Sequence, residues 1–138
     1  WISRKKIKQQ EKTNYEKASE VMKFLNLDHI ENDRAGSLSG GQKKLLELGR
    51  TMMVDAKLVL LDEVGAGVNK TLLKKIGQSI KTLNSELGYT FFMIEHDIDF
   101  ISSLCDPVIV MTEGSVLTEG QVEDIKNDDR VIEAYLGN

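Results

Sequence analysis

Two short apolar runs, separated by a segment with the pattern of a helix, constrain the fold more than any other feature. The first run, KLVLLDE at 57–63, stays apolar until it ends in two acids, which is typical of a buried parallel strand. The second, YTFFMIEH at 89–96, is rich in aromatic and β-branched residues and also predicts a strand. Between them, Asn69 can cap a helix with one apolar stripe, formed by Leu72, Leu73, Ile76, Ile80 and Leu83. A strand, a helix and a second strand in this order predict a parallel pair.

The same alternation continues toward the C-terminus. We expect a short helix over 97–104 and two strands over 107–111 and 116–120, joined by a tight turn at 113–115. The last segment, RVIEAYLG at 130–137, has the pattern of a short helix. Strands that alternate with helices indicate an α/β fold with a largely parallel sheet.

The N-terminal third is predicted to be mostly helical. Apolar residues recur at helical spacing over 15–25, and a second helix is expected over about 39–54. The apolar residues that this second helix can bury are Leu45, Leu46, Leu48 and Met52. The polar stretch 26–37 is expected to be a linker. Residues 1–12 are strongly basic, which favours a solvated segment or a frayed terminus over contact with an anionic surface.

Composition narrows the class of protein. A chain of 138 residues, 41% of them apolar, is one domain or a large piece of one, and it can bury a core. A net charge of −4 gives no sign of a nucleic-acid partner. Cys105, the one cysteine, cannot form an internal disulfide, which fits a reducing compartment. No apolar run approaches the roughly 20 residues of a membrane span, and no signal peptide is visible. The chain starts at Trp1 rather than Met, so we do not expect this to be the natural N-terminus.

Functional side chains follow the two predicted strands, at the edge of a parallel sheet where ligands bind. Asp62 and Glu63 close the first strand and His96 closes the second. Asp62 could hold Mg²⁺, which favours oxygen ligands, and Glu63 could orient or deprotonate an attacking water. His96 could donate a hydrogen bond to a phosphoryl oxygen. The structural alternatives are an acid pair that only begins a turn and a solvated surface histidine; His29, which has no such context, is assigned to the latter.

A serine and two glycines lie at the N-terminus of the second predicted helix, in the stretch Ser39-Gly40-Gly41-Gln42, which we call the helix mouth. The N-terminus of a helix presents unpaired N–H groups and the positive end of the dipole. A serine hydroxyl and glycine amides there form an anion site suited to phosphate. The alternative is a serine-capped helix preceded by a glycine turn.

Taken together, these motifs resemble those of the ABC-type ATPases. Residues 38–42, LSGGQ, read as the signature motif of that family, and residues 58–62 resemble its Walker B strand. Glu63 falls on the catalytic glutamate, residues 64–69 fall on the D-loop, and His96 falls on the switch histidine. The order and the spacing of these motifs match the family.

The resemblance implies a fold and a division of the chain. The fold would be α/β: part of a RecA-like P-loop NTPase core, mainly a parallel sheet with helices, together with part of the ABC helical subdomain. Residues 1–56 would be the end of the helical subdomain with the signature helix. Residues 57–138 would be the C-terminal part of the ATPase core with its C-terminal helix.

The resemblance also implies a mechanism that uses ATP and Mg²⁺. Two such domains sandwich two ATP molecules head to tail, and closure of the dimer moves membrane-spanning partner subunits. Asp62 would help to hold Mg²⁺, Glu63 would polarise the attacking water, and His96 would contact the γ-phosphate. The residues that would meet the nucleotide from the second side are Ser39, Gly40, Gly41 and Gln42. The D-loop residues that would cross the dimer interface are Ala66, Gly67 and Asn69.

Within the family, KKLLELGR at 43–50, Asn69 and the tail at 130–137 resemble the ATPase subunits of branched-chain amino acid importers. This implies a second ATPase subunit and transmembrane permease subunits as partners, no nucleic acid, and a cytoplasmic location on the inner face of the cell membrane. Two alternatives stay open. One is the ATPase of a lipopolysaccharide exporter, and the other is a truncated, non-catalytic chain that only binds a partner.

The chain departs from the family pattern in several places. Val64 stands where the family usually has Pro, and Val68 stands where it usually has Leu. No G-x-x-x-x-G-K-[ST] phosphate loop occurs, and the base-stacking aromatic and the glutamine loop are absent. The resemblance thus covers only the C-terminal half of the family's domain. The phosphate-loop strand would lie inside the sheet, so we expect a fragment of a longer protein, dependence on a second chain, or a rearranged sheet.

Overall fold

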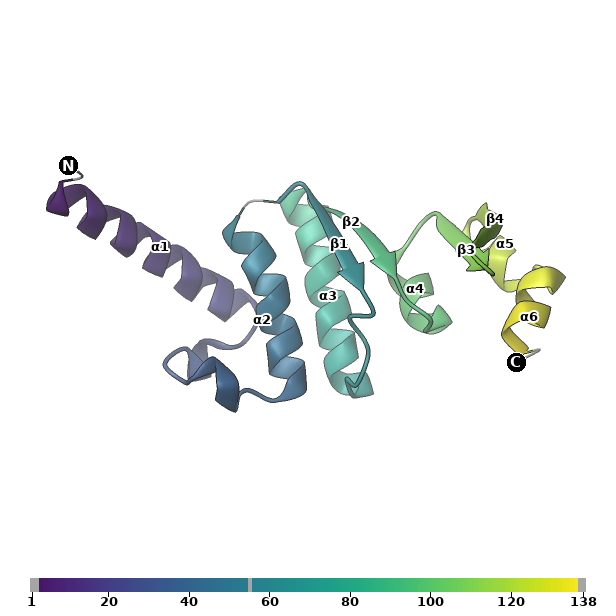
Figure 1. The fold of residues 1–138 in the computed structure, drawn as a ribbon, viewed down its shortest axis with the longest axis horizontal. Coiled ribbons are helices and arrows are strands. Elements are labelled where there is room, and N and C mark those ends of the chain that lie inside the picture. The colour runs from purple at the N-terminus through teal and green to yellow at the C-terminus, as the bar shows by residue number, and fades with distance from the viewer. Residues whose placement is uncertain (1–2, 55, 137–138) are drawn as a thin grey trace. The chain divides into compact units, whose positions relative to one another are not determined.

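The computed structural model of the chain describes residues 3–54 and 56–136. The chain divides into two compact units, residues 1–94 and 95–138, which Figure 1 shows as a ribbon. The first unit contains α1 (Arg4–Phe24), η1 (Asp28–Ile30), η2 (Ala35–Ser37), α2 (Gly40–Met53), β1 (Leu58–Asp62), α3 (Lys70–Leu87) and β2 (Thr90–Ile94). The second contains α4 (Ile98–Leu104), β3 (Val108–Thr112), β4 (Ser115–Gly120), α5 (Val122–Lys126) and α6 (Asp129–Leu136).

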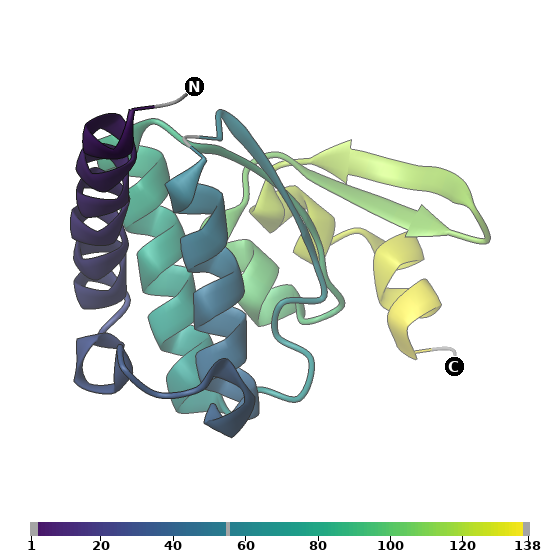
Figure 2. The same ribbon diagram turned by 60° about the vertical axis from the view of Figure 1, so that its left-hand side comes forward.

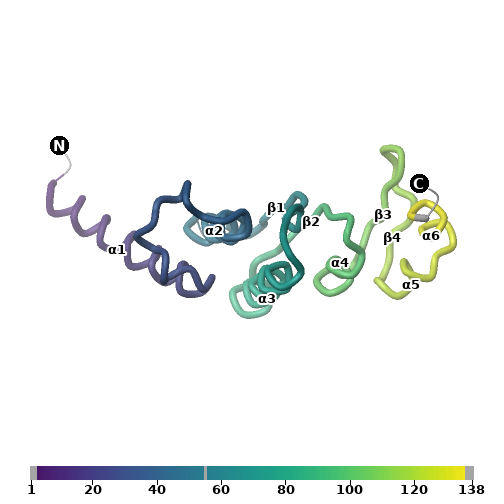
Figure 3. Tube along the Cα trace, turned by 90° about the horizontal axis from the view of Figure 1, so that it is seen from below, coloured from purple at the N-terminus to yellow at the C-terminus, as the bar shows by residue number. Residues whose placement is uncertain are grey.

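The strand, helix and second strand of the first unit form a parallel pair, as the sequence predicts. β1 pairs with β2 in register from Leu58 opposite Thr90 to Asp62 opposite Ile94. The connecting helix α3 lies along one side of the pair (Figure 3). The Asn69 side chain accepts a hydrogen bond from the Leu72 N–H at 3.0 Å and so caps α3 at its N-terminus.

The burial of this strand pair differs from the prediction. Leu58 and Leu60 are 56% and 71% exposed, and Phe92 and Ile94 are 53% and 57% exposed. These four side chains share one face of the pair, because their positions alternate along each strand and are in register. On the opposite face Val59 is only 4% exposed. The prediction of a buried strand is therefore wrong for one face, since α2 and α3 lie on only one side of the strands (Figure 2).

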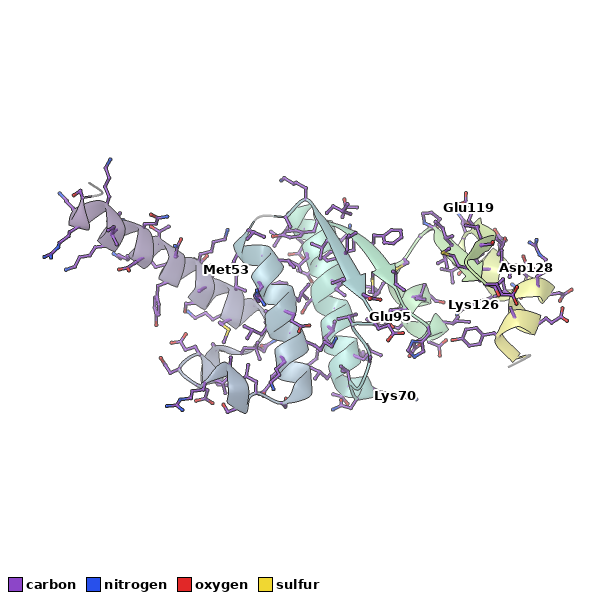
Figure 4. The ribbon with its side chains drawn as sticks, in the orientation of Figure 1. Met53, Lys70, Glu95, Glu119, Lys126 and Asp128 are labelled. Carbon is purple, nitrogen blue, oxygen red and sulfur yellow. The ribbon has the colours of Figure 1, made fainter. Side chains whose placement is uncertain are left out.

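The second helix forms as predicted and packs closely on the first. α2 buries Leu45, Leu48 and Met52. A Cβ atom added to Gly49 would lie 2.7 Å from a methyl group of Leu25 and 3.0 Å from one of Val21. Glycine at 49 therefore permits α1 and α2 to approach one another. The Lys17 ammonium donates to the Met53 carbonyl at 3.3 Å, at the end of α2 (Figure 4), where a cation also complements the helix dipole.

The basic N-terminal segment is helical from Arg4 onward. α1 begins at Arg4, and its residues through 16 are exposed, which confirms a solvated segment; residues 1–2 fall outside the described residues. The linker predicted over 26–37 contains η1 and η2 and is largely exposed, but it also buries Leu27. The buried Leu27 side chain thus packs the linker against the core of the unit.

The second unit is a hairpin with short helices. β3 and β4 pair antiparallel through a turn in which Glu113 and Gly114 have φ of 48° and 77°, which confirms the predicted tight turn. α4 and α6 lie where short helices were predicted, although Gly137 falls outside the described residues, while α5 was not predicted. Ile125 of α5 and Val131 of α6 are buried. None of the helices within the described ranges is long and apolar enough to span a bilayer.

Candidate functional site

At the mouth of α2, Ser39 and Gln42 cap the helix through two reciprocal hydrogen bonds. The Ser39 hydroxyl accepts from the Gln42 N–H at 3.3 Å, and the Gln42 side-chain oxygen accepts from the Ser39 N–H at 2.8 Å. This is a capping box, which explains why the helix begins here. The serine therefore caps the helix, as the structural alternative expects, but the two glycines lie inside α2 and not in a turn before it. The cap does not use the N–H groups of Gly40 and Gly41, which point along the helix axis at its positive end.

Gly40 and Gly41 differ in what a side chain at each position would meet. A Cβ atom on Gly41 would lie 1.7 Å from a methyl carbon of Leu72 in the first turn of α3, whereas one on Gly40 would meet nothing within 4 Å. Gly41 thus lets α2 pack against α3, and Gly40 leaves its backbone open to a ligand. The contact between Gly41 and Leu72 was not predicted from the sequence, because it joins residues of two separate elements.

Asp62 ends β1 and Glu63 follows it directly, and both residues are exposed. The Glu63 N–H donates to the Ile94 carbonyl at 2.9 Å, so the ladder with β2 extends one residue beyond the strand. Glu63 has φ of 44°, a left-handed conformation that is uncommon for a residue with a side chain. The chain therefore turns sharply at Glu63. Strained conformations of this kind are frequent where a side chain must be aimed at a ligand.

The segment after Glu63 folds into two hydrogen-bonded turns. The Ala66 N–H donates to the Glu63 carbonyl at 3.0 Å, and the Val68 N–H donates to the Gly65 carbonyl at 3.1 Å. Val64 is buried at 7% exposure and anchors the segment. Of the predicted interface residues at its outer end, Ala66, Gly67 and Asn69 are all exposed, and Gly67 has φ of 71°.

His96 lies in the second unit, on the short loop between β2 and α4, and its side chain is exposed. The Asp97 side chain accepts from the Phe100 N–H at 2.9 Å and caps α4. The His96 carbonyl accepts a hydrogen bond from the Tyr135 hydroxyl of α6. Sequence reasoning missed both neighbours. An aspartate directly before a helical pattern is a capping signal that identifies Asp97, but no local signal identifies Tyr135.

The structure thus places the predicted residues in two groups. The helix mouth, the acid pair and the turns that follow belong to the first unit, and His96 belongs to the second. Nowhere in residues 3–54 and 56–136 do three or more His, Cys, Asp or Glu side chains gather as a metal site would require. Asp62 could contribute a single carboxylate to a metal ion.

Comparison with known proteins agrees with the resemblance. The ABC transporter family profile matches residues 2–66, and the profile of the branched-chain amino acid ATP-binding cassette transporter matches residues 115–138. The chain is thus similar to the ABC transporter ATP-binding proteins in two separate segments. The observed α/β elements with a parallel strand pair are those of a partial ABC cassette.

Curated relatives align along nearly all of this chain. It is 43% identical over 136 residues to the "Probable branched-chain amino acid transport ATP-binding protein LivG" of Archaeoglobus fulgidus, covering 99% of the chain and 52% of the relative. It is 35% identical to the "High-affinity branched-chain amino acid transport ATP-binding protein BraF" of Pseudomonas aeruginosa, over 95% of the chain and 51% of the relative. The chain therefore spans about half the length of the relatives it matches.

A solved structure shows the same partial overlap. The chain superimposes with a TM-score of 0.82 and 36% identity on the crystal structure of an ATP-binding cassette of an ABC transporter in its ADP conformation. The alignment covers 91% of this chain and 51% of that one. The fold of the described residues is therefore that of about half of an ABC cassette.

Proposed function

We propose that the chain is the C-terminal portion of an ABC transporter ATPase subunit that binds and hydrolyses ATP in a head-to-tail dimer to drive import of branched-chain amino acids. The observation that carries the proposal is the alignment of 99% of the chain, at 43% identity, with a relative named for branched-chain amino acid transport. The profile match at 115–138 favours an importer of this kind over a lipopolysaccharide exporter, because that profile is described by branched-chain amino acid transport.

The mouth of α2 is suited to phosphate from a partner subunit. The Ser39–Gln42 cap fixes the first turn of the helix, and Gly40 leaves its N–H accessible. The helix dipole and the remaining amides favour an anion at this end. In our proposal, Ser39, Gly40, Gly41 and Gln42 close over the γ-phosphate of ATP that the partner holds.

In our proposal, residues at or just after the strand ends supply the hydrolytic groups. Asp62 would hold Mg²⁺, and its single carboxylate fits an ion that takes most of its ligands from nucleotide phosphates and water. Glu63 would orient the attacking water and accept its proton. His96 would hydrogen-bond the γ-phosphate. The turn residues Ala66, Gly67 and Asn69 would lie at the dimer interface.

The chain by itself lacks the main cradle for the β- and γ-phosphates, since no G-x-x-x-x-G-K-[ST] occurs in it. We propose that residues 1–56 complete a helical subdomain and residues 57–138 complete an ATPase core in a longer protein that supplies the phosphate loop. That protein would bind permease subunits at the inner face of the cell membrane.

The isolated 138-residue chain should show no tight MgATP binding in calorimetry and negligible hydrolysis. Micromolar affinity, with turnover lost in Glu63→Gln, would contradict this.

Two variants of the complete protein test the proposal together. Glu63→Gln removes the general base but leaves Asp62 and the phosphate loop, so turnover should fall by about 10²–10⁴-fold and the ATP-bound dimer should accumulate. Ser39→Arg places a bulky side chain before the Gly40 amide, so each subunit should still bind ATP while dimer and turnover are lost. Size-exclusion chromatography with ATP, alongside phosphate release, measures both. A Glu63→Gln protein that stays monomeric, together with an active Ser39→Arg protein, would refute the assignments.

A further inference from the structure

The N-terminal half of α1 carries a concentration of positive charge. Residues 4–12 include five basic side chains, and Glu11 is the one acid among them. The whole chain has a net charge of −4, so this positive charge is local to one end of one helix. α1 packs on α2 through its C-terminal half, where Val21 is buried, whereas every residue from 4 to 16 is exposed. This exposed half extends beyond α2 (Figure 1, Figure 3).

Four of these cations share one face of the helix, which we call the basic face: Arg4, Lys5, Lys8 and Lys12. Each lies three or four residues from another of the set, so their side chains are neighbours on the helix surface. Lys12 forms an exposed ion pair with Glu16 at 3.7 Å, a kind of contact that contributes little. The other three form no ion pair with any residue that the structure describes. The sequence alone favours a solvated segment here, and the structure adds that its cations are aligned on one exposed face.

The stability of α1 gives no reason for these charges. Its first turn contains basic residues and no acid, and the Ser3 side chain forms no capping hydrogen bond. The N-terminus of a helix is the positive end of its dipole, so cations there destabilise the helix and anions stabilise it. Arg4 and Lys5 therefore oppose the folding of the turn that holds them. A sequence that breaks a local rule without a compensating contact indicates a functional surface, and the helix dipole adds to the positive potential of this one.

The chemistry of the basic face fits the anionic surface of a lipid bilayer. Tyr15 lies on the same face, three residues after Lys12, and is 64% exposed. Tyrosine favours the level of the lipid headgroups, where its ring is shielded from water and its hydroxyl stays hydrated. Burial of the face against the remainder of a longer protein is unfavourable, because cations are seldom buried without paired acids.

We propose that the basic face of α1 binds the anionic surface of the membrane and adds to the attachment of the protein there. The choice of a lipid surface rests on the proposed function, in which the protein works at the inner face of a cell membrane. The cytoplasmic leaflet carries a negative surface potential that attracts polybasic segments. The helix lies along this surface rather than entering it, because Ile7 and Tyr15 are the only large apolar side chains over 4–16.

The test measures binding of the complete protein, without permease subunits or nucleotide, to vesicles of phosphatidylcholine mixed with phosphatidylglycerol. Lys5→Gln combined with Lys8→Gln and Lys12→Gln removes three charges and keeps helix propensity, since lysine and glutamine are similar helix formers. Each cation near an anionic surface contributes a factor of about 5, so this α1 variant should bind about 100-fold more weakly than the parent. Added salt should weaken the binding of the parent.

The matched control is Lys74→Gln with Lys75→Gln and Lys81→Gln, at three exposed positions of α3. It changes the net charge equally and should bind vesicles like the parent, and both variants should unfold thermally like the parent. Equal binding of the two variants, or equal binding of the parent to vesicles of phosphatidylcholine alone, overturns the proposal. If the α1 variant binds vesicles like the parent but binds permease subunits more weakly, the face contacts a protein instead and the proposal also fails.

These outcomes are separate from those that test the proposed function. Without vesicles, the α1 variant should hydrolyse ATP like the parent, since the basic face takes no part in hydrolysis, and Glu63→Gln should bind vesicles like the parent. If Glu63→Gln and Ser39→Arg refute the ATPase assignments while the α1 variant still loses vesicle binding, the proposed function fails and the lipid contact stands. If those assignments hold and the α1 variant binds vesicles like the parent, the lipid contact alone fails.

Discussion

Ser39 illustrates how one side chain can serve both the fold and the ligand. Its hydroxyl accepts from the Gln42 N–H and thereby caps α2, and in our proposal the same residue faces the partner's γ-phosphate. A stability measurement or an activity measurement alone would not separate these two roles. A substitution that keeps the cap and reverses the electrostatics does separate them.

We predict that Ser39→Asp preserves stability and strongly lowers turnover in the complete protein. Aspartate caps helices about as well as serine, so the free energy of unfolding should stay within about 0.5 kcal/mol of the parent value. A carboxylate about 4 Å from a phosphate charge is disfavoured by about 4 kcal/mol near a protein surface, so hydrolysis should fall by at least about 100-fold. Denaturant unfolding and phosphate release measure the two effects.

Ser39→Ala is the matched control and should show the opposite ranking. Loss of the cap costs about 1 kcal/mol of stability, but no charge repels the nucleotide. This variant should therefore be less stable than Ser39→Asp and more active. If Ser39→Asp hydrolyses ATP as fast as Ser39→Ala, the helix mouth does not face phosphate.

At the scale of elements, the packing of α1 on α2 depends on the absence of a side chain at Gly49. The methyl groups that an added Cβ would meet belong to Leu25 and Val21, which are 2% and 8% exposed. Since both neighbours are buried, neither can move away into solvent. Gly40 lies in the same helix and has nothing within 4 Å of the corresponding position.

We predict that Gly49→Ala destabilises the protein. Overpacking a core typically costs about 1–3 kcal/mol, which outweighs the roughly 1 kcal/mol by which alanine improves helix propensity over glycine. Gly40→Ala is the control with the same chemical change and should leave stability unchanged or slightly higher. Thermal unfolding of the complete protein distinguishes them. Equal midpoints for the two variants would show that α1 does not pack on α2 as described.

The individual elements were largely predictable, because their signals are local. Asn69 and Ser39 cap α3 and α2 in the structure, and the apolar runs at 58–62 and 90–94 form the strands. α5 was missed because it has only five residues and no side-chain cap, so it offers neither a periodic pattern nor a start signal. The exposed face of β1 and β2 was mispredicted, because burial depends on neighbours outside the strand itself.

The candidate site was predictable only in part, for a related physical reason. The spacing of LSGGQ, Asp62-Glu63 and His96 identifies the residues, since a family motif is a local pattern. Their supporting contacts join positions far apart in the sequence. Leu72 against Gly41 and Tyr135 at the His96 carbonyl are separated by 31 and 39 residues. No periodicity or capping rule reports such pairs, so they became visible only in the structure.

At the scale of the whole chain, the outer face of the β1–β2 pair is the main feature without a partner among the described residues. It presents Leu58, Leu60, Phe92 and Ile94, each more than half exposed. Contiguous apolar surface of this kind is rare on a soluble monomer and marks a contact site. β1 and β2 also form a sheet of only two strands, and the unpaired edge of a strand can pair with another chain.

We predict that the 138-residue chain, made alone, self-associates through this face. Leu60→Lys combined with Phe92→Lys places two charges at the centre of the face, in register with one another, and so opposes its burial against a second molecule. The double variant should sediment at a smaller mass than the parent chain at the same concentration.

The control is Ile7→Lys with Tyr15→Lys, at exposed positions of α1, which changes the net charge equally. Because only the face differs, the control should associate like the parent. A parent chain that sediments as a single compact monomer and unfolds cooperatively would refute the prediction, and equal masses for the two double variants would place the contact elsewhere.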